Sequence, residues 1–178
     1  MISHIDHCIG KLLDAVEKKG MLKNTILVLA GDNGLAVGQH GLMGKQNIYE
    51  HSVKVPLVMA GPGIPAGQIV KNDVYLMDVY PTLCELCGVE VPASVDGVSF
   101  AGMFTDPEVK THDSMYFAFQ SRIRGVKKGH FKLVEYRTED LKLSQLFDLE
   151  ADPWEMCNFY DIAGYENITE ELRHELFA

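Results

Sequence analysis

The sequence predicts an α/β protein with a buried parallel sheet in its core, followed by a small antiparallel α+β subdomain. Two short runs, residues 26–29 and 55–58, are apolar without alternation, which is typical of strands covered on both faces. Apolar residues at three- and four-residue steps predict a helix over residues 2–19. Short β-rich runs in the last third indicate the antiparallel part. We expect the two parts to span residues 1–110 and 111–178.

Length and composition are those of a folded globular chain. The 178 residues are 47% hydrophobic, which is enough for a core in one or two domains. The formal net charge of −9 argues against nucleic acid as the main partner, because a polyanion would be repelled. No stretch approaches the ~20 apolar residues of a membrane-spanning helix, so we expect no membrane span.

A polar loop joins the two apolar runs. Asp32 and Asn33 follow the first run, at the strand end where parallel α/β sheets bind ligands. Their carboxylate and amide oxygens are hard donors, suited to Ca²⁺ or Mg²⁺. Lys45 would place a compact positive charge beside such a metal, where it can hold an oxyanion. These residues predict metal-assisted chemistry on an anionic ester, although Asp-Asn-Gly by itself is more often ordinary turn chemistry.

The same loop resembles the second conserved block of the formylglycine-dependent sulfatases, within the alkaline-phosphatase-like superfamily. The stretch reads GDNGLAVGQHGLMGKQNIYEHSVKVPLVMAGPGIPAG. It shares with that block the Asp-Asn-Gly turn, a Gly-x-His-Gly turn, a lysine, a Tyr-Glu pair and a Val-Pro-Leu strand. The resemblance implies a partial alkaline-phosphatase-like sheet core, with the small antiparallel subdomain at its C-terminal side.

The resemblance also implies roles for residues of this loop. Asp32 and Asn33 would be ligands of a divalent cation, which is Ca²⁺ in most of the family, with Mg²⁺ as the alternative. Lys45 would contact the sulfate and take part in catalysis. His40 would lie near the substrate, as a second candidate for binding and catalysis. The substrate itself would be a sulfated small molecule or glycan.

The family's nucleophile is a formylglycine made from the cysteine of a Cys-x-Pro-x-Arg motif. None of the four cysteines here stands in that context. The resemblance therefore implies that the formylglycine, with the remaining metal ligands, lies in an N-terminal half that would complete the site. On this interpretation the chain alone is inactive. A periplasmic or secreted location is suggested by similarity alone.

Two competing functions stay open. A phosphodiester or phosphonate monoester hydrolase of the same superfamily would share the Asp and Lys of the loop, although Asn33 in place of His favours sulfate. Alternatively, the loop merely holds its shape within a non-catalytic binding or assembly module. The first competitor differs in the ester it cleaves, and the second predicts no dependence of turnover on Lys45.

Other residues have expected structural roles. Tyr49 and Glu50 should brace the loop, and Asp78 should begin the regular part of a helix over residues 73–87. Residues 131–136 alternate in polarity as a half-exposed strand does. A basic cluster either draws an anionic substrate toward the site or forms a solvated sheet edge; its members are Arg122, Arg124, Lys127, Lys128 and Lys132.

Overall fold

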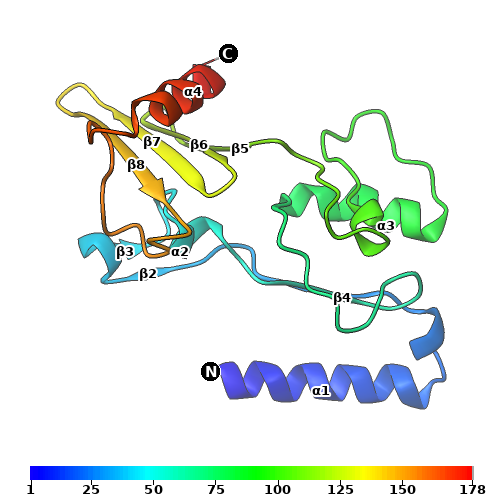
Figure 1. Cartoon of the computed structure of the whole chain (residues 1–178). Coiled ribbons are helices and arrows are strands. Elements are labelled where there is room, and N and C mark those ends of the chain that lie inside the picture. Colours follow the sequence, from blue (N-terminus) through cyan, green and yellow to red (C-terminus); the bar gives the residue numbers. More distant parts are fainter. Residues whose placement is uncertain (178) are drawn as a thin grey trace. The chain divides into compact units, whose positions relative to one another are not determined.

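The computed structural model describes residues 1–177, and the chain divides into two compact units (Figure 1). The first contains Met1–Ala30 and Leu57–Thr111, and the second contains Gly31–Pro56 and His112–Ala178. The loop between the two apolar runs thus belongs to the same unit as the C-terminal sheet. The division at residues 110 and 111 that we expected for the domains stays a prediction, but all four candidate site residues lie in the second unit.

The first unit begins with the predicted amphipathic helix. Helix α1 spans Ile2–Lys18 and is followed by Gly20, whose φ of +67° suits a residue without a side chain. None of its residues is buried, and Ile2, Ile5 and Leu12 on its apolar face are exposed. None of the described helices has the length and apolar character needed to cross a membrane.

The two apolar runs form strands β1 (Leu27–Ala30) and β4 (Leu57–Ala60), which pair antiparallel. The expectation that these runs lie in a buried parallel sheet was wrong for this pair. Parallel neighbouring strands need a crossover connection. The chain between β1 and β4 instead reverses direction, so that β4 runs back along β1. Val28 and Val58 are exposed among the described residues.

The rest of the first unit contains a buried carboxylate, that of Asp78. Helix α3 (Val79–Cys87) follows directly on Asp78, which confirms the predicted start of the regular helix. The Asp78 side chain is fully buried and accepts hydrogen bonds from the backbone N–H groups of Tyr75, at 2.7 Å, and Val98, at 2.9 Å. Asp78 is therefore structural. Short 3-10 turns complete this unit: η1 (Leu22–Asn24), η3 (Leu76–Asp78) and η4 (Ala101–Phe104).

The second unit contains the predicted antiparallel sheet. Its four strands lie in sequence order, each antiparallel to the next (Figure 1). Neighbours joined by tight turns pair in this way because a short connection leaves no room for a crossover. The strands are β5 (Met115–Phe119), β6 (Ile123–Lys128), β7 (Phe131–Arg137) and β8 (Lys142–Asp148).

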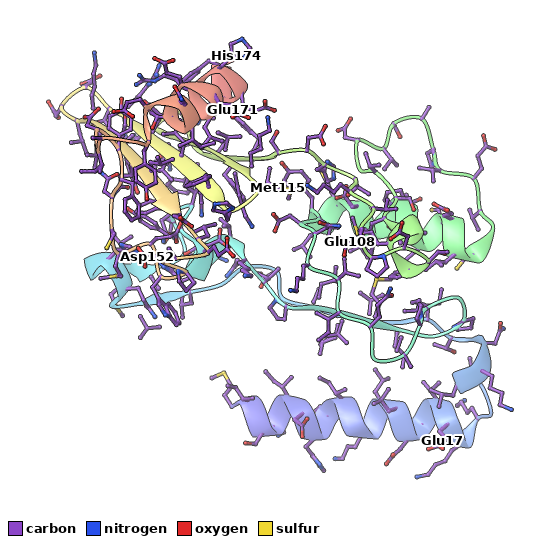
Figure 2. The ribbon with its side chains drawn as sticks, viewed as in Figure 1. Glu17, Glu108, Met115, Asp152, Glu171 and His174 are labelled. Atoms are coloured by element: carbon purple, nitrogen blue, oxygen red, sulfur yellow. The ribbon has the colours of Figure 1, made fainter. Side chains whose placement is uncertain are left out.

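Both faces of this sheet are covered. On one face Leu133 of β7 packs with Leu172 of helix α4 (Glu166–Phe177), which carries the labelled Glu171 and His174 in Figure 2. On the other face its neighbour Val134 packs with Ile48 and Tyr49 of the loop. The central residues of β7 are consequently buried without alternation, so the prediction of a half-exposed strand was wrong. Its polar residues point into covered faces and need partners there.

The loop has little regular structure of its own and is tied together by hydrogen bonds. The Gly34 N–H donates to the Ser52 carbonyl oxygen at 2.9 Å, and a Cβ at Gly34 would overlap the His51 carbonyl oxygen. Only glycine fits this close approach. The elements of the loop are β2 (Ala36–Val37), η2 (Gln39–Gly41), β3 (Met43–Gly44) and α2 (Glu50–Val53).

Candidate functional site

The structure brings together two of the predicted site residues from opposite ends of the loop. The Lys45 Nζ donates to the Asn33 Oδ1 at 2.6 Å, across twelve positions of sequence. The Asn33 Nδ2 in turn donates to the Gly34 carbonyl oxygen at 2.9 Å, which orients the amide and leaves its oxygen toward the lysine. The Lys45 ammonium is thus held beside the amide oxygen of Asn33, the residue that directly follows the exposed Asp32.

The oxygen atoms of Asp32 and Asn33 are of the type that binds a hard divalent cation. Carboxylate and amide oxygens are the donors that Ca²⁺ and Mg²⁺ prefer. The described residues contain no cluster of three or more His, Cys, Asp or Glu side chains able to hold a metal. These two side chains fall short of the six to eight oxygen ligands of Ca²⁺, so this part of the chain offers part of a coordination sphere.

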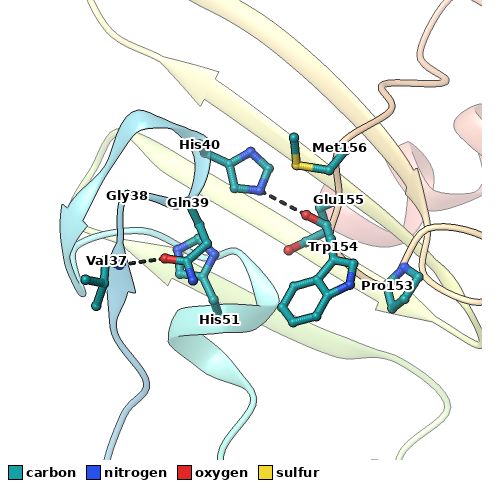
Figure 3. Close-up of a pocket in the computed structure, with 9 residues that line it drawn as sticks. All are labelled: Val37, Gly38, Gln39, His40, His51, Pro153, Trp154, Glu155 and Met156. Carbon is teal, nitrogen blue, oxygen red and sulfur yellow. Dashed lines mark hydrogen bonds between the residues drawn. The ribbon is translucent and has the colours of Figure 1, made fainter.

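His40 belongs to a different cluster. Its ring stacks on Tyr49 with centroids 4.1 Å apart and planes 1° from parallel. Its Nε2 lies 3.1 Å from the Trp154 carbonyl oxygen and therefore carries the proton that it donates there (Figure 3). The backbone of His40 has a φ of +54°, in the left-handed region. The proposed contact of His40 with substrate stays a prediction.

Tyr49 and Glu50 brace the loop, as predicted. The Tyr49 ring is buried, and its hydroxyl donates to the Gln145 Oε1 at 2.8 Å. The Glu50 N–H donates to the Glu155 Oε2 at 2.6 Å. Both residues therefore connect the loop to the C-terminal sheet and to the Asp-Pro-Trp-Glu turn that follows it.

A cavity of about 540 Å³ lies between the loop and the Asp-Pro-Trp-Glu turn (Figure 3). Neither His51 nor Trp154 was predicted from the sequence to lie in a site. The Trp154 side chain is largely exposed. Two loop segments far apart in sequence form this cavity, which no local pattern predicts. Its lining residues are Val37, Gly38, Gln39, His40, His51, Pro153, Trp154, Glu155 and Met156.

His51 lines this cavity and has a depressed pKa. Burial lowers the pKa of His51 below its ordinary value, and the nearby His40 and Lys132 lower it further. The His51 Nε2 has no hydrogen-bond partner among the described residues. A protonated ring would therefore place an N–H at Nε2 that has no acceptor among these residues.

This pKa makes folding sensitive to acid. Below the ordinary His pKa of 6.5, the unfolded chain binds a proton that folded His51 does not, so the unfolding free energy falls as pH drops from 6.5 toward the lower folded-state pKa. We expect His51→Gln to weaken this dependence. Urea unfolding at several pH values between about pH 5 and pH 7.5 measures this dependence. If the unfolding free energy changes with pH equally in the parent protein and in His51→Gln, His51 is not the cause.

A buried ion network in the second unit was missed from the sequence. The Lys132 Nζ lies 3.0 Å from the Glu50 Oε1 and 2.9 Å from the Glu155 Oε1, and the Lys132 side chain is 0% exposed. Burial acts to raise the pKa of Glu50, but Lys132 outweighs it, so the pKa lies below its ordinary value. Burial raises the pKa of Glu155 above its ordinary value, although Lys132 acts to lower it.

The proposed basic cluster is therefore not one surface. Both of its alternatives, attraction of substrate and a solvated edge, were wrong for Lys132, because the covered face of β7 buries it. Lys128 instead forms an exposed ion pair with Glu171 at 2.7 Å. Arg124 donates to the backbone carbonyl oxygen of Gln120 at 2.6 Å.

Solved structures identify the class of protein. One protein, in complex with its substrate D-glucosamine-2-N,6-O-disulfate, matches with a TM-score of 0.87 and 31% identity, over 99% of this chain and 38% of that one. The phosphonate monoester hydrolase of Agrobacterium radiobacter matches at 0.85 with 24% identity, over 99% of this chain and 39% of that one, and shares the fold. The fold is that of the C-terminal portion of a sulfatase in the alkaline-phosphatase-like superfamily, as predicted.

Within that class, the chain belongs to the family described as N-sulphoglucosamine sulphohydrolase, C-terminal, which matches residues 38–178. Choline-sulfatase of Rhizobium meliloti (strain 1021) is 36% identical over 163 residues, which cover 88% of this chain and 31% of that protein. The chain thus spans about a third of the length of this relative.

Proposed function

We propose that this chain supplies part of the metal and sulfate site of a sulfuric ester hydrolase. The contact between the Lys45 Nζ and the Asn33 Oδ1, at 2.6 Å, carries the proposal. Asp32 and Asn33 would hold a divalent cation, Ca²⁺ or alternatively Mg²⁺, through their side-chain oxygens. When bound, the cation would supply Lewis-acid polarisation of a sulfate oxygen.

Lys45 would act on the charge of the sulfate group. Cleavage of the S–O bond leaves negative charge on the sulfate oxygens and on the departing oxygen. An ammonium held in place by Asn33 stabilises that charge without having to reorient, and the effect is large only where water is excluded. Lys45 and Asp32 are both exposed in this structure. The proposal therefore requires a further segment to cover them.

That segment would also carry the formylglycine nucleophile. No Cys-x-Pro-x-Arg motif occurs in these 178 residues, and the chain spans about a third of the relative named above. We therefore propose that the chain alone is inactive. The substrate would be a sulfated small molecule or glycan, which the disulfated glucosamine of the similar structure supports. His40, oriented by Tyr49 and the Trp154 carbonyl, would lie near that substrate.

The test is an assay of the full-length protein on an aryl sulfate and an aryl phosphodiester side by side. We expect turnover of the sulfate to be at least about tenfold faster, a difference of ~1.4 kcal/mol in activation free energy. Chelation should remove the activity, and Ca²⁺ should restore it. Preference for the phosphodiester would instead identify the phosphonate and phosphodiester branch that shares this fold, and hydrolysis of neither ester would identify a non-catalytic module.

A further inference from the structure

The buried ion pair between Glu50 and Lys132 joins the candidate site to the C-terminal sheet. We propose that these two are positioning residues for Asp32, Asn33 and Lys45, an inference that rests on the proposed function. Neither side chain would touch the substrate. They would act by fixing where the loop lies on the sheet.

Lys132 connects the sheet to the loop. Lys132 lies on β7 with its side chain wholly buried, and its Nζ reaches the Glu50 Oε1 at 3.0 Å. Glu50 is the first residue of α2, and its N–H donates to the Glu155 Oε2 at 2.6 Å. Side chain and backbone of one residue are thus both held by charged partners, which fixes the position and direction of the helix start.

Helix α2 is in turn connected to the segment that carries Asn33. The Ser52 carbonyl oxygen in α2 accepts the Gly34 N–H at 2.9 Å. Gly34 follows Asn33 directly, and its backbone lies so close to α2 that a Cβ at Gly34 would overlap the His51 carbonyl oxygen. A displacement of α2 would therefore move the end of the loop that carries Asp32 and Asn33.

The start of α2 is also connected to Lys45, through Asn47. The Tyr49 N–H donates to the Asn47 Oδ1 at 3.1 Å, and the Asn47 N–H donates to the Lys45 carbonyl oxygen at 2.9 Å. Asn47 and Tyr49 are both buried. Both ends of the candidate site are thus tied to the short segment that Lys132 holds.

Apolar packing alone would not set this position. Ile48 packs closely on the sheet, since a Cβ at Gly125 would lie 2.6 Å from its Cδ1. Apolar contact is non-directional, however, and tolerates small slides of one surface on another. A charge-assisted hydrogen bond in a dry interior is directional. The Glu50–Lys132 pair therefore fixes the position of α2 on the sheet, which apolar packing alone does not fix.

The test replaces Glu50 by Gln in the full-length protein. Gln keeps the shape of Glu50 and an oxygen acceptor but removes the carboxylate charge, so the contact with the Lys132 Nζ loses its charge assistance while Lys132 stays paired with Glu155. We expect kcat on an aryl sulfate to fall about tenfold or more, with a smaller change in KM, because small misplacements of catalytic groups lower turnover steeply. Hydrogen exchange should accelerate over residues 33–47 but not over strands β5 and β6.

Leu172→Ala is the matched control, because it weakens the same sheet from its α4 face, away from the loop. It should lower the unfolding temperature while kcat and the exchange of residues 33–47 stay as in the parent protein. If Leu172→Ala slows turnover and loosens the loop as much as Glu50→Gln does, the pair is merely structural and the inference fails. Unchanged kcat and exchange in Glu50→Gln would also overturn it.

The proposed function and this inference can fail separately. If the parent protein cleaves no sulfate ester, the proposed function fails, and the exchange of residues 33–47 alone decides whether Glu50 positions the loop. If the parent is active but Glu50→Gln is indistinguishable from it, only the inference fails.

Discussion

Replacing Lys132 by Met should lower the unfolding free energy of the second unit by about 3–5 kcal/mol, the cost of leaving buried charges unpaired. Lys132 is wholly buried between the Glu50 and Glu155 carboxylates, and those side chains are 13% and 1% exposed. Met fills most of the same volume, so the loss is electrostatic and not a cavity effect. Urea unfolding at pH 7, followed by circular dichroism, measures it.

The pH dependence separates this cause from a packing defect. Without Lys132, burial raises the pKa of both carboxyl groups above their ordinary value of 4.5. The folded variant then binds protons that the unfolded chain has released, so its stability falls as pH rises above 4.5. The difference between variant and parent should therefore narrow as pH falls toward 4.5. A difference that is constant with pH would indicate lost packing.

Glu155→Gln is the control for this charge balance. It leaves one lysine with one carboxylate, and the Gln oxygen can still accept the Glu50 N–H. We expect its unfolding free energy to lie within about 1 kcal/mol of the parent value, as for a conservative change that leaves no unpaired charge. A loss as large as that of Lys132→Met would show that the hydrogen-bond geometry matters more than the charge.

Replacing Lys45 by Ala in the full-length protein should lower turnover of a sulfate ester about a hundredfold or more, as expected for loss of a fixed charge contact to the transition state. The unfolding free energy should change by less than about 0.5 kcal/mol, because Lys45 is exposed and a surface substitution removes little packing. Steady-state kinetics with urea unfolding of the same preparation measure both effects.

Lys142→Ala, at an exposed lysine of the same unit, is its control and should keep parental turnover. Intact turnover in Lys45→Ala would support the non-catalytic alternative, in which the loop only holds its shape. Equal losses in the two variants would mean that general surface charge, and not the contact with Asn33, governs the rate.

Local patterns predicted much of the secondary structure. The apolar period of α1, the turn formers between β5 and β8, and the start of α3 at Asp78 act over a few residues, so they can be recognised along the chain. The pairing of β1 with β4 depends on where a long loop returns. Its antiparallel direction was therefore predicted wrongly.

The residues of the candidate site were likewise predicted only in part. Asp32, Asn33 and Lys45 were predicted because their chemical types and spacing form a recognisable block. Lys132 was misplaced because alternation along β7 indicates a half-exposed strand only while one face stays open.

The sequence alone determined which groups are available: two hard oxygen donors and one ammonium on a glycine-rich loop, with no formylglycine motif among 178 residues. Only the tertiary structure decided that the loop packs on the C-terminal sheet and buries Lys132 against Glu50 and Glu155. Those three charges lie far apart in sequence, and nothing local distinguishes Lys132 from a solvated lysine. The physical reason is that the cost of burying a charge and the gain from pairing it both arise only when distant segments exclude water together.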